Sequence, residues 1–161
     1  MVNHQVNKYK KAQNELSLLA ANPYEIIQVL MKELMTQLYI AKASIDRADI
    51  EARSQAINKS IDLIGGLKGG LNMEAGGEIA DNLNNLYDYM VIRLSEANLN
   101  SSADMVEEVK NLFLPIKQAW DGISEEDKQK GFQLIAEHSM TTTHTTPHYE
   151  HSISQMRIIV K

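Results

Sequence analysis

Apolar residues recur in steps of three and four along four long stretches of the chain. The first stretch opens with Asn22, Pro23 and Glu25, which together form a helix start: an N-cap, a proline at the first helical position and a nearby carboxylate. The stripe that follows is Ile27, Met31, Leu34, Leu38, Ala41 and Ile45. Its regular spacing is typical of a helix in a coiled-coil-like bundle.

A second helix is predicted from about residue 49 to about residue 68, after the polar run 46–49. Its apolar stripe is Ile50, Ile57, Ile61, Ile64 and Leu67. Gly65 and Gly66 stand near its end, and each costs roughly 1 kcal/mol relative to alanine inside a helix. Two interpretations follow: a fraying helix end before the next turn, or a place where another backbone comes close.

A third helix is predicted after Gly76 and Gly77, which end the preceding segment, and Glu78 supplies a carboxylate at its start. The helix is expected to end near residues 98–100. Its stripe, predicted to be buried, is Ile79, Leu83, Leu86, Met90, Leu94 and Ala97. Amide and phenol groups stand beside it, at Asn82, Asn85, Tyr87 and Tyr89. Such a helix packs on one side and presents a hydrogen-bonding face on another.

A fourth helix is predicted from a cap at Ser101 or Ser102 to a C-cap at Gly122. Its stripe is Met105, Val109, Leu112, Ile116, Ala119 or Trp120, and Ile123. Pro115 lies inside this helix and is expected to kink it, because proline removes one backbone hydrogen bond. A shorter fifth helix is predicted over about residues 124–137.

Four helices of about 20 residues, each about 30 Å long, must run antiparallel to their neighbours when the connections are short. The predicted fold is therefore all-α: an antiparallel up-down four-helix bundle with a short extra C-terminal helix, over residues 22–138. Residues 1–21 are predicted to form a mobile, basic N-terminal arm. Residues 139–161 are rich in Thr and His and are predicted to form a flexible tail.

Composition narrows the class of protein. The chain has 161 residues, 43% hydrophobic and 23% charged, as expected for one soluble globular domain. The net charge of −5 gives no general attraction to nucleic acid or to an anionic membrane. No apolar run reaches the roughly 18 residues that would insert in a membrane, and no apolar signal core opens the chain. Cysteine is absent, which excludes disulfides and thiol catalysis. The expected location is cytoplasmic.

Residue types that carry chemistry are sparse on the predicted helices. No Glu-x-x-His pair of the kind that builds di-metal sites in bundles occurs. The histidines His144, His148 and His151 could bind a transition metal weakly; the alternative is a flexible tail with no specific ligand. No glycine loop fits a phosphate, and no Ser, His and Asp set has triad spacing. The expectation is a protein that is not an enzyme and holds no cofactor or metal.

Aromatic side chains leave two alternatives open. Tyr87 and Tyr89 point about 200° apart on a helix, so they cannot both lie in the core. Either one packs at the edge of the bundle with its hydroxyl in water, or the tyrosines and asparagines form a partner-binding face. Trp120 is either a core residue at helical spacing or part of a groove for a partner.

Several short motifs occur in a fixed order over about residues 6–123. They are Tyr9-x3-Gln13, Asn22-Pro23-x2-Ile26-Ile27, Gly77-Glu78-Ile79-Ala80-x-Asn82-Leu83-x2-Leu86-Tyr87-Asp88-Tyr89-Met90, Leu94-x2-Ala97-Asn98, Val106-Glu107-Glu108-Val109 and Ala119-Trp120. Together they resemble the FliS family, the flagellin-specific export chaperones of bacteria. The central run is specific, whereas the helix start is not.

The resemblance implies a cytoplasmic bundle that binds the disordered C-terminal segment of flagellin. Binding would prevent premature polymerisation and support delivery to the flagellar type III secretion apparatus. An anti-sigma factor and export-gate components are further partners that the resemblance suggests. The tail after about Ser139 departs from the compact family pattern.

The resemblance also motivates a candidate binding surface, which the helical spacing permits. Its predicted residues are Leu67, Leu71, Ile79, Asn82, Leu86, Tyr87, Met90, Ile116 and Trp120. The N-terminal arm, through Val6 and Tyr9, is expected to lie over part of this surface when no partner is bound.

Two other functions remain open on the sequence. One is a helical-bundle regulator that binds a different flagellar partner, such as the anti-sigma factor. The other is a metal-dependent bundle enzyme.

Overall fold

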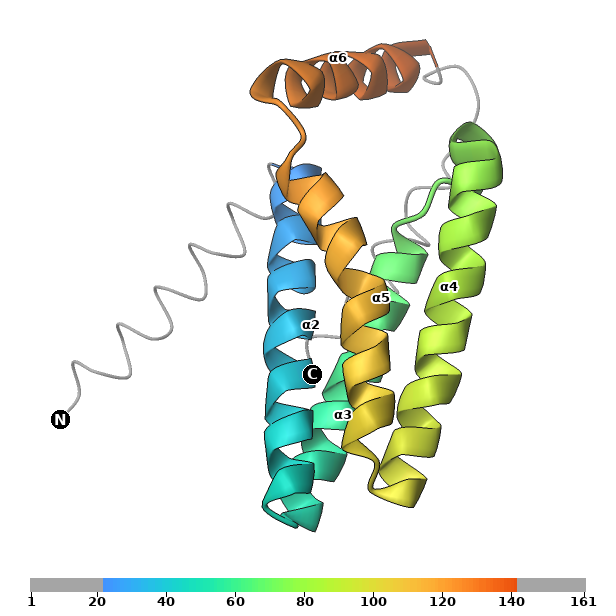
Figure 1. Cartoon of the computed structure of the whole chain (residues 1–161). Coiled ribbons are helices and arrows are strands. Elements are labelled where there is room, and N and C mark those ends of the chain that lie inside the picture. Colours follow the sequence, from blue (N-terminus) through green and yellow to red (C-terminus); the bar gives the residue numbers. More distant parts are fainter. Residues whose placement is uncertain (1–21, 142–161) are drawn as a thin grey trace, which may run out of the picture. The chain divides into compact units, whose positions relative to one another are not determined.

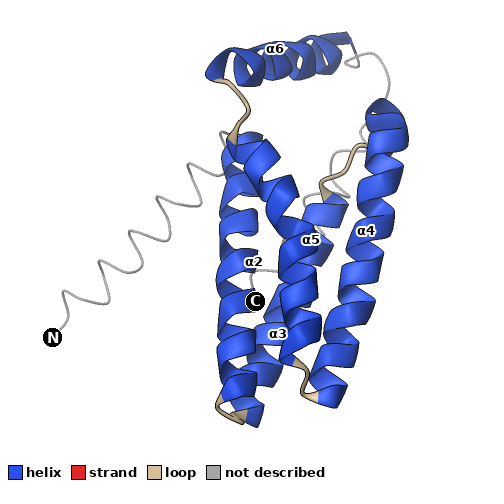
Figure 2. Cartoon of the chain, viewed as in Figure 1, coloured by secondary structure: helices blue, strands red, loops and turns tan. Residues whose placement is uncertain are grey.

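The computed structural model describes residues 22–141, and this part of the chain is almost entirely helical (Figures 1 and 2). Its elements are α2 (Pro23–Asp46), α3 (Ile50–Gly69), α4 (Met73–Asn100), α5 (Ala103–Asp121) and α6 (Glu125–Thr141). The all-α prediction is confirmed, and no strand occurs between residues 22 and 141. The predicted arm, residues 1–21, and tail residues 142–161 lie outside the described residues.

Each helix of the bundle begins with a side-chain cap. Asn22 accepts hydrogen bonds from the backbone N–H groups of Tyr24 at 3.0 Å and Glu25 at 3.3 Å. Asp49 and Asn72 cap α3 and α4 in the same way. Side-chain oxygens at these positions satisfy N–H groups that have no partner within the helix, so short polar residues set where each helix starts.

The two serines between α4 and α5 have different roles. Ser102 is the N-cap of α5, and its hydroxyl accepts from the N–H of Met105 at 3.4 Å. Ser101 ends α4 in the left-handed region, with φ of 52°. Gly122 is the C-cap of α5, as predicted. α5 continues through Pro115 without interruption.

Helices α2 to α5 form the predicted four-helix bundle. α2 packs against α3 and α5, and α4 packs against the same two helices, so each helix has two neighbours. The connections are only residues 47–49, 70–72 and 101–102, which forces successive helices to run antiparallel. α6 belongs to a second unit that begins at Ile123, and it continues to Thr141, past its predicted end at Glu137.

All four helices contribute to one apolar core. The predicted stripe of α2 is confirmed: four of its residues are buried and the two at its ends are partly buried. The largest fully buried side chains include Leu34, Leu38, Ile57, Ile64, Met90, Leu94 and Phe113. The buried Ser60 donates its hydroxyl to the carbonyl of Ala56 at 2.8 Å, so this polar group has a partner inside the core.

The predicted stripes were wrong at several positions. Ile50 and Ile79 were expected in the core but are 66% and 73% exposed. Ile50 is the first residue of α3, at an end of the bundle where no neighbouring helix covers it. In α5 the core residues are Val106, Val109 and Phe113. Of these, Val106 and Phe113 were missed, because they lie one residue along from Met105 and Leu112, and two overlapping stripes fit the same spacing.

Glycines shape the start of α4. The helix begins at Met73, earlier than predicted, and is interrupted at Gly77, whose φ of 49° and ψ of −132° are not helical. A Cβ at Gly76 would lie 2.5 Å from the Cβ of Ala80, closer than two such atoms can approach. By contrast, α3 continues through Gly65 and Gly66 and ends at Gly69, close to its predicted end. No backbone of another element lies within 4 Å of a Cβ placed at either glycine, so the close approach considered there does not occur.

Candidate functional site

The two halves of α4 differ in how well they are covered. Met90 is 0% exposed and Ile79 is 73% exposed. They are eleven residues apart, which at about 100° per residue places them only about 20° apart around the helix. Ile79 therefore points to the same side as the core, but none of the bundle helices α2 to α5 covers it. Figure 1 shows the reason: α4 and α5 lie close near their connection and separate toward the start of α4.

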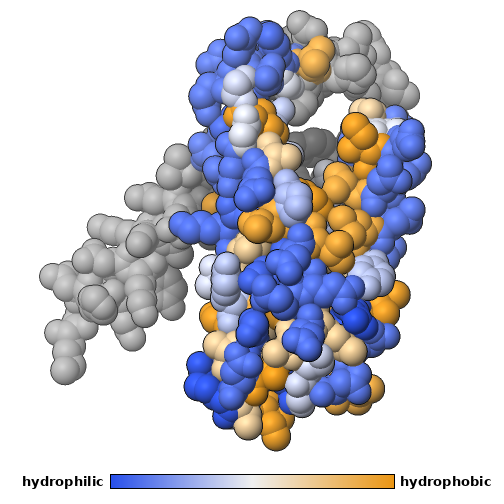
Figure 3. Space-filling model, viewed as in Figure 1, coloured by the Kyte–Doolittle hydropathy of each residue, from blue (hydrophilic) through white to orange (hydrophobic). Residues whose placement is uncertain are grey.

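α5 shows the matching feature at its opposite end. Trp120 is seven residues after Phe113 and fourteen after Val106, so the three side chains lie on one line along the helix. Val106 and Phe113 are buried, whereas Trp120 is only half-buried. Apolar side chains consequently gather between the first half of α4 and the last half of α5 (Figure 3). We call this region the apolar opening and define it by Leu71, Ile79, Leu83, Leu86, Leu112 and Ile116.

A polar network spans α4 and α5 where the apolar opening ends. Nε of Arg93 donates to Oε2 of Glu108 at 2.7 Å, and the hydroxyl of Tyr89 donates to Oε1 of the same carboxylate. Leu86 precedes Tyr89 and Arg93 on one face of α4, and Leu112 follows Glu108 by one turn on α5. The network therefore closes the apolar opening on the side of the α4–α5 connection.

The charges in this network shift each other's pKa. The hydrogen bond from Tyr89, followed by the bond from Arg93, lowers the pKa of the Glu108 carboxyl below its usual value. The same contact with Glu108 raises the pKa of the Tyr89 hydroxyl. Both shifts favour a carboxylate that accepts and a phenol that donates.

The lowered pKa of Glu108 predicts how stability depends on pH. A carboxyl with a lower pKa in the folded state stabilises the fold above its unfolded pKa, and that contribution is lost as the pH falls. We therefore expect Glu108→Gln to be less stable than the wild type near neutral pH, with the difference shrinking between about pH 5 and about pH 3. Urea unfolding at several pH values, monitored by circular dichroism, measures the difference in the free energy of unfolding. Asp62→Asn, at an exposed position of α3, is the control and should show no such trend. A difference that stays constant over this range would contradict the prediction.

A shallow depression lies at one end of the apolar opening. Its volume is about 330 Å³, and it is lined by Gly70, Leu71, Asn72, Ala75, Gly76, Ile79, Ala80 and Leu83. Most of these atoms are apolar. Gly76 lines the depression, and the helix is interrupted at the next residue, Gly77. A second depression, on α5, is lined by three carboxylate side chains, by Asn111 and by Leu112, which also belongs to the apolar opening.

The structure divides the predicted site residues into three groups. Leu71, Ile79, Asn82, Leu86, Ile116 and Trp120 are exposed or half-buried and available at or beside the apolar opening. Leu67, Tyr87 and Met90 are at most 2% exposed and lie beneath the surface, in the core. Val6 and Tyr9 lie outside the described residues, so their predicted covering role has no structural account.

Burial distinguishes the two tyrosines, which were predicted not to lie in the core together. Tyr87 is 2% exposed, and this burial raises the pKa of its hydroxyl, whereas Tyr89 is 43% exposed. Leu83 and Leu112, both predicted as core positions, are half-buried residues of the apolar opening instead. No sequence signal distinguishes them from core leucines, because their exposure depends on where the neighbouring helix runs.

Metal-ligating residues do not converge in the part of the chain that the structure describes: within residues 22–141 no group of three His, Cys, Asp or Glu side chains could hold an ion. The histidines His144, His148 and His151 fall outside that range. No helix within the same range is long and apolar enough to cross a membrane.

Comparison with known proteins places this bundle in a family. The family model of the flagellar protein FliS matches residues 5–127, which contain all of α2 to α5 and the apolar opening. The chain belongs to the FliS family. Residues 128–161 lie beyond the FliS match, and they include most of α6.

Individual FliS relatives agree with the family match. The flagellar secretion chaperone FliSB of Pseudomonas aeruginosa is 40% identical over 119 residues, covering 74% of this chain and 94% of the relative. The flagellar secretion chaperone FliS of Salmonella typhimurium is 39% identical over 120 residues, covering 74% and 89%. The Vibrio cholerae protein of the same name is 37% identical over 118 residues, covering 73% and 87%. The resemblance noted from the sequence motifs is thereby confirmed.

Proposed function

We propose that this FliS-family protein is a cytoplasmic export chaperone that binds the disordered C-terminal segment of flagellin over the apolar opening. Bound in this way, flagellin could not polymerise early and would be held ready for the flagellar type III secretion apparatus. The observation that carries the proposal is the 73% exposure of Ile79 on the core side of α4. The names of the relatives, flagellar secretion chaperones, support the class of partner.

The proposed client is an amphipathic segment that buries its apolar stripe only after assembly. While such a segment is free, the stripe drives association with other copies. A groove between helices can cover the stripe by receiving the segment as a helix. A disordered segment loses conformational entropy when it binds, so it needs a long apolar contact surface to reach useful affinity.

The apolar opening provides such a surface. It runs along α4 from Ile79 to Leu86, continues at Leu71, and has Leu112 and Ile116 on its α5 side. Asn82, exposed between Ile79 and Leu86, offers an amide for hydrogen bonds with the backbone of the bound segment. The proposed action makes and breaks no covalent bond, in keeping with a chaperone rather than an enzyme.

Calorimetric titration with a peptide from the flagellin C-terminus tests the proposal. The wild type should bind with one-to-one stoichiometry. Ile79→Asp should weaken binding about 30-fold or more, because a charge placed against the apolar client removes a contact of about 2 kcal/mol. The substitution should change the free energy of unfolding by no more than about 0.5 kcal/mol, since Ile79 is exposed in the free protein.

Ile92→Asp is the matched control. Ile92 lies on the same helix and is 59% exposed, but its direction differs from that of Ile79 by about 140° around the helix axis. The Ile92→Asp variant should bind the peptide with the affinity of the wild type. Absence of binding heat and of any nuclear magnetic resonance perturbation with excess peptide would overturn the proposal. Binding of the anti-sigma factor instead of flagellin would favour the regulator.

A further inference from the structure

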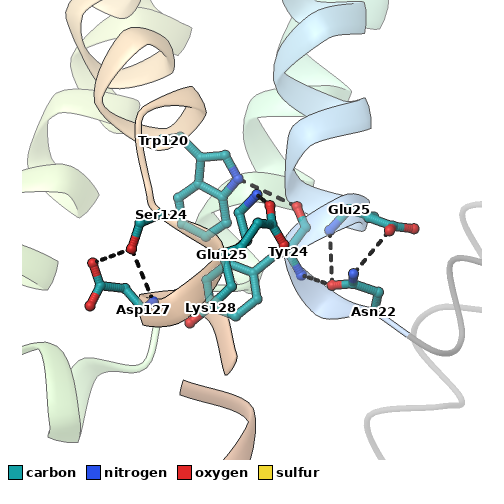
Figure 4. A network of polar contacts seen from close by, with 8 residues as sticks. All are labelled: Asn22, Tyr24, Glu25, Trp120, Ser124, Glu125, Asp127 and Lys128. Atoms are coloured by element: carbon teal, nitrogen blue, oxygen red, sulfur yellow. Dashed lines mark hydrogen bonds and ion pairs between the residues drawn. The ribbon is translucent and has the colours of Figure 1, made fainter. Parts of the chain in front are cut away.

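The carboxyl end of α5 contacts the amino end of α2 through an aromatic pair, Trp120 and Tyr24. Nε1 of Trp120 donates to the backbone carbonyl oxygen of Tyr24 at 3.4 Å, and the two ring centroids are 5.5 Å apart with planes inclined by 32° (Figure 4). We call this the Tyr24–Trp120 contact. It joins residues 96 positions apart in the sequence.

This contact lies at the end of α5 where α4 and α5 are separated (Figure 1). Trp120 continues the line of Val106 and Phe113, which enter the core, yet its indole meets the first turn of α2. In its first half α5 contacts α4 through the 2.7 Å ion pair between Glu108 and Arg93, and α2 through Lys110, whose Nζ lies 5.0 Å from the centre of the Tyr39 ring. At its carboxyl end it contacts α2 through Trp120. Where α5 diverges from α4, Ile79 of α4 is exposed and Leu83 is half-buried.

Pro115 lies between Glu108, which contacts α4, and Trp120, which contacts α2. Proline has no backbone N–H, so the helical hydrogen bond to the carbonyl of Asn111 cannot form. A helix is most easily bent where such a bond is missing. The direction of α5 after Pro115 therefore depends on side-chain contacts more than it would in an ordinary helix.

We propose that the Tyr24–Trp120 contact is a positioning device that holds the last turns of α5 against α2 and so keeps the apolar opening accessible to the client. The proposal rests on the proposed function for its consequence, and Trp120 acts here through Tyr24. It differs from the sequence-based expectation that Trp120 itself touches the partner.

Variants at both ends of the contact test the proposal by client affinity. Trp120→Ala and Tyr24→Ala should each weaken binding of the flagellin peptide about tenfold, as expected if the open arrangement falls to about one tenth of the population. The double variant should bind no worse than Trp120→Ala, because that substitution already removes the whole contact, whereas Tyr24→Ala removes the ring packing and keeps the backbone carbonyl that accepts from Trp120. Trp120→Phe, which keeps a ring and loses the indole N–H, should fall between wild type and Trp120→Ala. If Tyr24→Ala binds like the wild type, or the two effects add, Trp120 contacts the client directly and the proposal is wrong.

A distance measurement tests the same device without any client. The chain has no cysteine, so Glu78→Cys and Gln118→Cys would be the only sites for spin labels, and both positions are exposed. We expect one narrow distance distribution with the contact intact and a broadened or shifted one in Trp120→Ala and Tyr24→Ala. An unchanged distribution in both variants would overturn the proposal.

Asn98→Ala is the control for both measurements. Asn98 accepts a hydrogen bond from Arg53 at 3.0 Å, near the α4–α5 connection, and lies about 29 Å along α4 from Ile79. It should leave the distance distribution and the client affinity unchanged although it removes an interhelical contact. If the wild type binds no peptide at all, the proposed function fails, and the distance distribution alone decides whether the contact positions α5.

Discussion

Replacing Phe113 by alanine should destabilise the protein by about 3–5 kcal/mol, the usual cost of truncating a buried phenylalanine. Phe113 is 0% exposed and stands first among the large, fully buried side chains. Its ring lies within one core shared by α2 to α5, so truncation leaves a cavity that the helices cannot fill. A domain of this size is stable by about 5–15 kcal/mol, so the loss would be a large fraction of the whole.

Urea unfolding monitored by circular dichroism measures this loss of stability. Two other substitutions give stability changes for comparison. Leu99→Ala, at a residue 85% exposed, should change stability by at most about 0.5 kcal/mol. Met105→Ala tests the stripe that the sequence favoured, and it should cost less than Phe113→Ala because Met105 is only partly buried. The reverse order would mean that α5 turns its other stripe to the core.

Two glycine-to-alanine substitutions should change stability in opposite directions. Gly77→Ala should destabilise by about 1–3 kcal/mol, because φ of 49° with ψ of −132° is a conformation that residues with a Cβ rarely adopt. Gly65→Ala should stabilise by about 0.5–1 kcal/mol, because Gly65 lies inside α3 and an added Cβ would have no atom within 4 Å.

Because both substitutions add a methyl group that would have no atom within 4 Å, their comparison isolates the backbone conformation. Chemical unfolding under identical conditions gives the two free-energy differences. Equal signs would show that Gly77 is accommodated as an ordinary helical residue. Gly77→Ala should also weaken flagellin binding, because the interrupted backbone shapes the depression that contains Leu71 and Ile79.

Much of the fold could be predicted because its signals are local. Asn22 and Ser102 cap helices through side chains that reach backbone groups two or three residues away, so the neighbouring sequence contains the whole interaction. The regular stripe of α2 likewise specified which face would be buried. The short connections then required antiparallel neighbours, and the bundle followed.

The candidate site could be predicted only in outline. Motifs along the third predicted helix indicated the FliS family and pointed to Ile79, Asn82 and Leu86, which the structure leaves accessible. The same reasoning also included Leu67, Tyr87 and Met90, which are buried. A helix repeat gives the direction of a side chain, but it does not say whether another helix lies in that direction.

From its amino-acid order alone, the chain determined most helix caps, the approximate helix bounds, the all-α class and the family to which it belongs. Only the tertiary structure decided which leucines and isoleucines are core and which are surface. Ile79 and Met90 point almost the same way from α4, yet one is exposed and the other buried, because α5 leans toward Tyr24 of α2 at its carboxyl end. That angle arises from contacts between residues far apart in sequence, and no local pattern encodes it.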